Sequence, residues 1–230
     1  MKKIAKIIVS AFILIWGFSV SGCSQDIEIH DKENRVVFEV DASCKMSLTK
    51  SFSEAKLVVN GPLFDSQGNP DGGVIFDGKW GKEKVTTGSK IKDLEKNFNF
   101  GNLSGIFVLR NDNSIHIYHY QEDFSIKNVR FGFQSGPILV SNGRIPEGIG
   151  KIKLSQTIFP TKRAGIGYRG DKIIIIVSKE EISLDDFAKM FLDEGVDNAL
   201  YLDGKNVVYR YKSKNIVGSV PKGASMIKID

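Results

Sequence analysis

Short apolar runs separated by turn residues recur along most of this chain. Runs rich in valine, isoleucine, phenylalanine and tyrosine, bounded by glycine, asparagine, aspartate or proline, predict β-strands. We predict strands over residues 35–40, 56–60, 73–78, 105–109, 114–120, 137–143, 163–168 and 171–177. The run at 173–177 has no polar alternation, so it should be a central strand covered on both faces.

One segment near the C-terminal end has helical periodicity instead. Apolar residues recur at helical spacing after Ser183, a typical N-cap, and Gly195 can end the helix: Leu184, Phe187, Ala188 and Phe191. A second short helix is predicted over residues 91–97. The pattern therefore predicts an α+β fold, a single mixed domain with a β-rich sheet core and few helices.

The first residues have the layout of an export signal. Lys2, Lys3 and Lys6 precede an apolar run over 7–18, and the tetrad at 20–23, VSGC, resembles a bacterial lipobox. We predict a signal peptide over 1–22, a lipid on Cys23, a polar tether over 23–34 and one domain over 35–230. The protein would then be exported and lipid-anchored in the cell envelope, in the periplasm or at the surface. An uncleaved membrane anchor is the alternative.

Charge excludes one class of partner. The 230 residues carry a formal charge of +5, and removing residues 1–22, with three lysines and no acid, leaves 208 residues with +2. Such a balance gives no broad positive field for nucleic acid, so we expect no nucleic-acid partner. With its thiol lipid-modified, Cys23 would leave Cys44 without a partner, so we expect no disulfide and a small buried side chain at Cys44.

The segment NALYLDG at 198–204 is the clearest candidate for chemistry. Its apolar run ends on Asp203, followed by Gly204, directly after the predicted helix. An acid where a strand leaves a buried sheet is held in position while the loop admits a substrate. An Asp-Gly turn that closes a hairpin between the apolar run and residues 206–211 explains the same residues equally well.

Two further segments place polar side chains beside glycines. Asn60 and Gly61 follow a predicted strand and precede a glycine-rich loop, where backbone amides can approach a ligand closely. Gln134, Ser135 and Gly136 offer an amide, a hydroxyl and backbone N–H groups that can hold an anionic oxygen. Ordinary turns would have the same composition.

Arg163 stands beside two glycines, Gly165 and Gly167. Its planar guanidinium suits a phosphate or a carboxylate, although a lone arginine is more often a surface ion-pair partner. The match of residues 165–170 to G-x-G-x-x-G precedes a strand, so we reject dinucleotide binding. His116 and His119 should lie on opposite faces of a strand. We expect no cofactor and no metal.

Taken in order, these segments resemble the phosphodiester glycosidase family, and in particular a compact bacterial branch of it. The resemblance runs from about residue 36 to the C-terminus through VVNGPLFD at 58–65, SGIFVL at 104–109, QSGPILVSNG at 134–143, RAGIG at 163–167, the helix at 183–195 and NALYLDG. It implies a mixed domain whose strand ends converge on one pocket, and cleavage of a sugar from a phosphodiester at the anomeric carbon.

The resemblance also implies roles. Asp203 would act at the sugar carbon as nucleophile or base, and Arg163 would bind the phosphate. The other matching residues, Asn60, Gly61, Gln134, Ser135, Gly136, Gly165, Gly167 and Gly204, would contact the substrate, with Lys205 as a further phosphate contact.

Two functions follow for an envelope lipoprotein of this family. One is hydrolysis of glycosyl phosphodiesters in a surface or exopolysaccharide-type glycan, and the other is non-catalytic binding of a phosphorylated glycan through the same pocket. Lys205 and Asn206 motivate the second, because the family usually has small residues there. Both require Asn60, Ser135, Arg163 and Asp203 to line one pocket.

Overall fold

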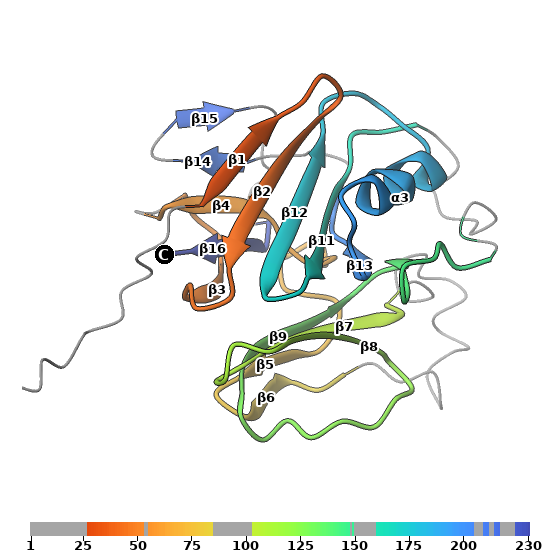
Figure 1. Cartoon of the computed structure of the whole chain (residues 1–230). Coiled ribbons are helices and arrows are strands. Elements are labelled where there is room, and N and C mark those ends of the chain that lie inside the picture. The colour runs from red at the N-terminus through yellow and green to blue at the C-terminus, as the bar shows by residue number, and fades with distance from the viewer. Residues whose placement is uncertain are drawn as a thin grey trace, which may run out of the picture.

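A six-stranded antiparallel sheet forms the centre of the molecule (Figure 1). The computed structural model describes residues 27–52, 55–84, 103–147, 149, 160–204, 209–211, 214–216 and 224–230. The predicted signal peptide, Cys23, the predicted helix over 91–97, Lys205 and Asn206 lie outside these ranges. The first sheet has the order β1 (Glu28–Asp31), β2 (Arg35–Asp41), β12 (Lys172–Ser178), β11 (Ala164–Arg169), β13 (Asn198–Tyr201) and β10 (Ile138–Val140).

Two five-stranded sheets pack beside it. The second has the order β15 (Lys214–Ile216), β14 (Tyr209–Tyr211), β4 (Leu57–Asn60), β16 (Met226–Ile229) and β3 (Met46–Thr49). The third has the order β6 (Lys79–Lys82), β5 (Val74–Phe76), β9 (Val129–Ser135), β7 (Gly105–Arg110) and β8 (Ile115–His119). The prediction of one β-rich domain is confirmed, but a single helix among the described residues makes the fold nearly all-β rather than evenly α+β.

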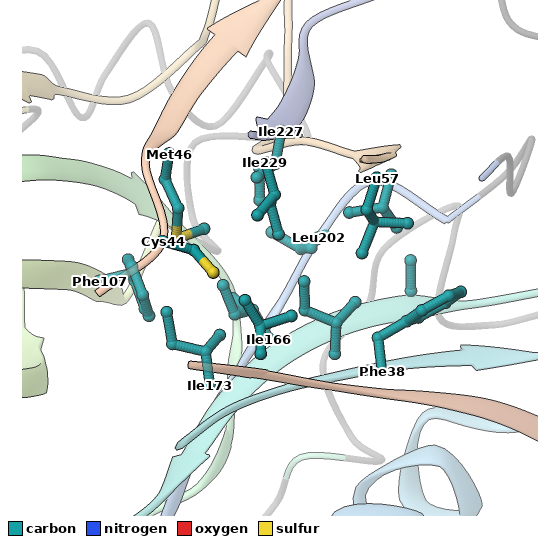
Figure 2. Close-up of a cluster of buried hydrophobic side chains, with 14 of the residues drawn as sticks. Phe38, Cys44, Met46, Leu57, Phe107, Ile166, Ile173, Leu202, Ile227 and Ile229 are labelled. Carbon is teal, nitrogen blue, oxygen red and sulfur yellow. The ribbon is translucent and has the colours of Figure 1, made fainter. Parts of the chain in front are cut away.

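Strand β12 is central, as its apolar run predicts. It pairs with β2 on one side and β11 on the other. Because side chains alternate along a strand, Ile173 and Ile175 join the main core between the sheets, whereas Ile174 and Ile176 pack under the helix. Figure 2 shows that main core, where Phe38, Leu57, Phe107, Ile166 and Ile227 come together from all three sheets.

The predicted helix is present as α3 (Leu184–Asp193) and covers one face of the first sheet (Figure 1). The Ser183 side chain accepts a hydrogen bond from the backbone N–H of Asp186 at 3.0 Å, and Gly195 has a φ of 67° just past the helix end. Both caps therefore form as the sequence predicts.

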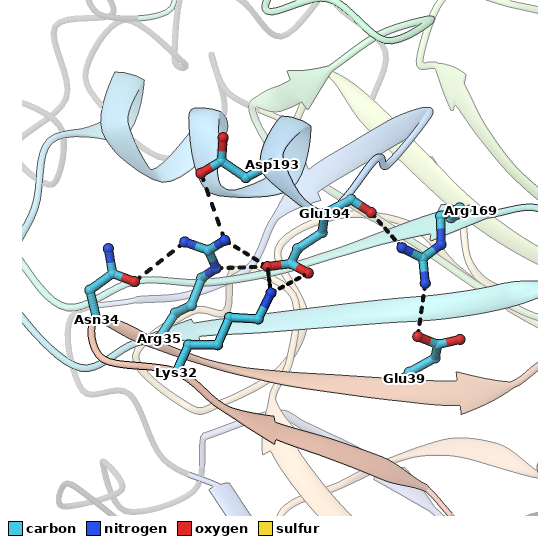
Figure 3. A network of polar contacts seen from close by, with 7 residues as sticks. All are labelled: Lys32, Asn34, Arg35, Glu39, Arg169, Asp193 and Glu194. Carbon is cyan, nitrogen blue, oxygen red and sulfur yellow. Dashed lines mark hydrogen bonds and ion pairs between the residues drawn. The ribbon is translucent and has the colours of Figure 1, made fainter.

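An ion-pair network fastens the helix end to the first two strands (Figure 3). The Glu194 carboxylate accepts hydrogen bonds from Lys32 Nζ at 2.6 Å and from Arg35 Nη2 at 2.7 Å. Burial acts to raise the pKa of Glu194, but these two cations outweigh it and hold the pKa below 4.5. Arg169 donates to the backbone oxygen of Glu194 at 2.7 Å and to Glu39 at 2.9 Å.

The folded domain begins before the end of the tether predicted over 23–34. Strand β1 pairs with β2 across Glu28–Asp31, and Ile27 is buried, so the folded domain already includes residues 27–34. All four side chains of β1 are exposed, and backbone hydrogen bonds hold this edge strand. Without an apolar face it has no hydrophobic signal in the sequence.

The expectation that Cys44 has no partner was wrong. Cys44 is fully buried beside Met46 in the main core (Figure 2), and it is disulfide-bonded. The only other cysteine of the sequence is Cys23, which lies outside the described residues. A disulfide between Cys44 and Cys23 and a lipid on Cys23 would exclude each other, because both would use the Cys23 thiol.

Candidate functional site

Asp203 lies where the chain passes from the first sheet to the second. Strand β13 ends at Tyr201 between β11 and β10, whereas β14 pairs with β4 and β15. We call Leu202, Asp203 and Gly204 the crossing segment. The hairpin alternative is wrong, because β13 and β14 belong to different sheets.

Backbone hydrogen bonds hold the crossing segment from two sides. The N–H of Leu202 donates to the oxygen of Ala164 at 3.0 Å, and the N–H of Asp203 donates to the oxygen of Gly61 at 3.0 Å. Asp203 is 9% exposed, and Asn60, at the end of β4, is 7% exposed. The Asn60–Gly61 and Asp203–Gly204 steps, far apart in sequence, are therefore direct neighbours.

Ser135 ties β9 to the same place. Its Oγ donates to the backbone oxygen of Tyr201 at 2.8 Å and accepts from the N–H of Leu63 at 3.4 Å. The Gly136–Pro137 peptide that follows is cis, with a φ of 149° at Gly136. Because its one proton is already donated within the protein, the buried Ser135 hydroxyl acts here as a structural link between three segments.

Arg163 is placed differently from either expectation. It is fully buried rather than on the surface, and its Nε donates to the oxygen of Ile182 at 2.8 Å. Its Nη1 donates to the hydroxyl of Tyr201 at 3.3 Å, and its Cζ lies 5.7 Å from the centre of that ring. In this arrangement the guanidinium supports the interior of the site.

Tyr201 is the residue that sequence reasoning missed. Its ring lies between Arg163 and helix α3, where it also contacts Phe187. Burial raises the pKa of Tyr201 to about 12, with the Arg163 cation opposing the rise and the Asp203 carboxylate adding to it. The signal was available, because two residues before Asp203 in a strand lie on the same face.

Two glycines of the matching motifs are required by close packing. A Cβ on Gly204 would collide with the Tyr201 hydroxyl and lie 2.9 Å from the oxygen of Lys162. A Cβ on Gly61 would lie 2.5 Å from the oxygen of Ser225. These backbones can approach only without side chains, and the approach brings Asp203 against Gly61.

Gln134, Gly165 and Gly167 do not offer their groups to a ligand in this structure. The Gln134 side chain accepts from the N–H of Gly73 at 3.1 Å and donates to the oxygen of Leu103 at 2.9 Å. A Cβ on Gly165 would lie 2.9 Å from Phe191 of helix α3, and one on Gly167 would lie 2.6 Å from the oxygen of Asn198. In this structure the three residues are engaged in internal packing, and their predicted substrate contacts stay predictions.

The four residues expected to line one pocket converge, but in a closed arrangement. Asn60, Ser135, Arg163 and Asp203 surround Tyr201 and the crossing segment, each at most 9% exposed. Two cavities of about 350 and 420 Å³ lie beside them, and neither is lined by these four residues. Pro137 joins the two places, since it lines the first cavity and its oxygen accepts from the N–H of Tyr201 at 3.0 Å.

The described residues include neither a metal-binding cluster nor a membrane-spanning helix. Within the described ranges, no group of three or more His, Cys, Asp or Glu residues is placed to hold a metal ion. His116 and His119, expected on opposite faces, both line the 420 Å³ cavity. Among the residues that the structure describes, no helix has the length and apolar character of a membrane span.

The geometry defines a β-rich domain in which one acid, Asp203, is held between two sheets. The family model for phosphodiester glycosidases matches residues 53–213, so the chain belongs to the phosphodiester glycosidase family. This match confirms the resemblance found in the sequence. Comparison with curated proteins found no match.

Solved structures share the fold. The catalytic domain of zebrafish N-acetylglucosamine-1-phosphodiester alpha-N-acetylglucosaminidase, auto-inhibited by its pro-peptide, is similar with a TM-score of 0.62 and 17% identity, over 92% of this chain and 84% of that one. A hypothetical protein from Synechocystis is similar with a TM-score of 0.53 and 13% identity, over 88% of this chain and 61% of that one.

Proposed function

We propose that this protein hydrolyses glycosyl phosphodiesters in a surface or exopolysaccharide-type glycan. The observation that carries the proposal is the position of Asp203, held between two sheets by the Gly61 carbonyl and beside the Arg163–Tyr201 pair. The family supports the reaction class, and the fixed carboxylate supplies a group suited to it.

One carboxylate can suffice for this chemistry. A phosphate monoester has a second pKa of about 6, so it leaves the sugar with little protonation. The transition state of glycoside cleavage is oxocarbenium-like, and a carboxylate can stabilise it or attack the anomeric carbon. Asp203 would take that role, with the Asn60 side chain orienting the substrate.

Arg163 and Tyr201 would support catalysis indirectly, by holding Asp203 in position. Nη1 of Arg163 donates to the hydroxyl of Tyr201, and the Gly204 backbone packs against both residues. We therefore treat Arg163 as a positioning residue in this arrangement, and Lys205 as the remaining candidate for a phosphate contact.

The second function is binding of a phosphorylated glycan without turnover. The closed state of the site favours it, because Asp203 is 9% exposed and Arg163 is fully buried. Binding through the same pocket does not require the Asp203 carboxylate to reach the reacting carbon, whereas hydrolysis does.

Hydrolysis assays discriminate between the two functions. The chain without residues 1–22 would be incubated with UDP-N-acetylglucosamine and with nitrophenyl phosphodiesters of several sugars, and the released sugar would be measured. We expect turnover by the wild type and a loss of about a thousandfold or more in Asp203→Asn. Asp197→Asn, at the other end of β13, is the matched control and should retain activity.

Equal rates for wild type and Asp203→Asn would reject hydrolysis at this site. Binding of the same phosphodiesters without turnover would then support the second function. Absence of both binding and turnover would reject both.

We also propose export and lipid attachment at Cys23. The VSGC tetrad behind an apolar run supports the anchor, while the disulfide of Cys44 competes for the same thiol. Mass spectrometry of protein recovered from bacterial membranes decides: a diacylglyceryl adduct on Cys23, lost in Cys23→Ala, supports the lipid. A water-soluble chain with both cysteines oxidised contradicts it.

A further inference from the structure

Two adjoining cavities lie beside the crossing segment, between the third sheet and the first. Cavities of about 350 and 420 Å³ share His119, Ile138 and Ser141 in their walls. Strand β8 forms one wall, while β10, β11 and β13 contribute residues to the other. Each cavity falls in the range of roughly 300–1,000 Å³ that is usual for small-ligand sites. We call the pair the β8 groove.

Two ring-bearing residues of β8, His116 and Tyr118, line the 420 Å³ cavity, and packing holds their rings in place. The His116 and Tyr118 rings stack with centroids 5.5 Å apart, and Tyr118 stacks on Phe124 at 4.6 Å. The Tyr118 hydroxyl accepts from Nη2 of Arg110 at 3.2 Å. The orientation of the two rings is therefore set before a ligand arrives.

The opposite wall carries an oriented amide. Nδ2 of Asn198 donates to the hydroxyl of Tyr168 at 2.8 Å, and its Oδ1 accepts from the N–H of Asn142 at 3.1 Å. The second N–H of the amide and the Tyr168 hydroxyl proton remain as potential donors. Ser141, half-buried, adds a hydroxyl to the wall. Fixed neutral donors and acceptors of this kind suit hydroxyl groups.

The charges of the groove argue against a phosphate there. The described residues that line the two cavities include no lysine or arginine, and their carboxylates are those of Glu122 and Glu147. Burial lowers the pKa of His116, with Arg110 adding to this effect and Asp112 opposing it, which favours the neutral imidazole. A phosphate would meet negative charge without a cation to balance it.

We propose that the β8 groove binds a neutral saccharide segment, namely unphosphorylated sugar units that flank the cleaved linkage. This proposal rests on the proposed function, because it assumes that the cleaved linkage of the substrate lies at Asp203. Pro137 connects the two places, because it lines the groove and its oxygen accepts from the N–H of Tyr201. Strand β13 runs from Asn198 in the groove toward Asp203, about 17 Å for five extended residues.

Titration of the ¹⁵N-labelled chain without residues 1–22 tests the proposal. The probes are chitotetraose, maltotetraose and cellotetraose, none of which carries phosphate. We expect at least one probe to shift the amide signals of Ser141, Asn142 and Asn198 in a saturable way. His116→Ala and Glu122→Ala should weaken that binding by about fivefold or more, whereas His30→Ala on β1 should not change it.

Failure of saccharide binding in the groove can be distinguished from failure of hydrolysis at Asp203. Asp203→Asn should bind the neutral probe as tightly as the wild type, so loss of hydrolysis leaves the binding test readable. The proposal is overturned if all three probes leave the groove signals unshifted at 10 mM, roughly the weakest range of specific binding. It is also overturned if shifts occur but His116→Ala and Glu122→Ala bind like the wild type.

Discussion

The crossing segment and the β8 groove are neighbours built in opposite ways. Around Asp203, the polar residues are buried and are bound to the protein itself, as Ser135 is to Tyr201 and Arg163 is to Ile182. Along the groove, Tyr118 and Asn198 are only half-buried and face open volume. The first region fixes one geometry, and the second leaves surface for a partner.

This difference explains which residues each region requires. Buried polar groups must keep every partner, since an unsatisfied one costs about 1–3 kcal/mol, so changes at the crossing segment should lower both stability and activity. Half-exposed groups in the groove can be exchanged at small cost to the fold. Stability measurements can therefore test the comparison without knowing the substrate.

The largest effect on stability is expected for Arg163→Met. The change removes the fully buried guanidinium, its hydrogen bond to the Tyr201 hydroxyl and the shorter of the two hydrogen bonds to the Ile182 oxygen. We expect the free energy of unfolding to fall by about 3 kcal/mol or more, measured by urea denaturation. Arg144→Met, on an exposed turn, is the matched control and should change it by about 0.5 kcal/mol or less. Equal losses in both variants would contradict a special role for Arg163.

Much of the fold could be predicted because its signals are local. The continuous apolar run of β12 and the caps of α3 appear in neighbouring letters of the sequence. Strand β1 could not be predicted from apolar pattern, because its exposed side chains carry none and β2 alone holds it. Strand β9 contains Phe131 and Phe133 in alternation, but its last residues were interpreted as a binding motif.

The candidate site was predictable in position and less so in detail. The order of motifs located Asp203 at a strand end, and the structure places Gly61 and Ser135 around it. The partners of Arg163 and Gln134 are backbone oxygens of Ile182 and Leu103, which any residue type could supply. The sequence therefore does not indicate which backbone oxygens these two side chains bind.

The second effect is a loss of stability at high pH that comes from Tyr201. Its folded pKa of about 12 lies above the ordinary value of 10, so the stability it contributes is complete below pH 10 and is lost as the pH rises toward 12. Two pKa units correspond to at most about 2.7 kcal/mol. In Tyr201→Phe this part of the pH dependence should disappear, measured by urea denaturation between pH 8 and 11.5. Parallel curves for the two proteins would contradict it.

The third effect is expected for Gly204→Ala. The added methyl group would collide with the Tyr201 hydroxyl and crowd the oxygen of Lys162, so the crossing segment must shift. Overpacking of this kind costs about 1–3 kcal/mol, and the shift should also lower any hydrolytic activity by displacing Asp203. Gly81→Ala, on exposed β6, places its methyl group nearest the flexible Phe76 ring at 3.3 Å, with the Val74 oxygen at an ordinary 3.8 Å, and serves as the control. Full activity in Gly204→Ala would show that the tight packing does not position the acid.

The smallest effect is expected in the β8 groove. His116→Ala and Glu122→Ala remove one half-buried imidazole and one exposed carboxylate, and each should change the free energy of unfolding by about 0.5 kcal/mol or less. The measurement is the same urea denaturation used for Arg163→Met. A loss above about 1.5 kcal/mol would mean that the stacked rings of His116 and Tyr118 support the fold, as the buried residues around Asp203 do. A small loss of stability, combined with weaker saccharide binding, would show that the β8 groove residues serve binding, whereas the buried residues around Asp203 maintain the fold.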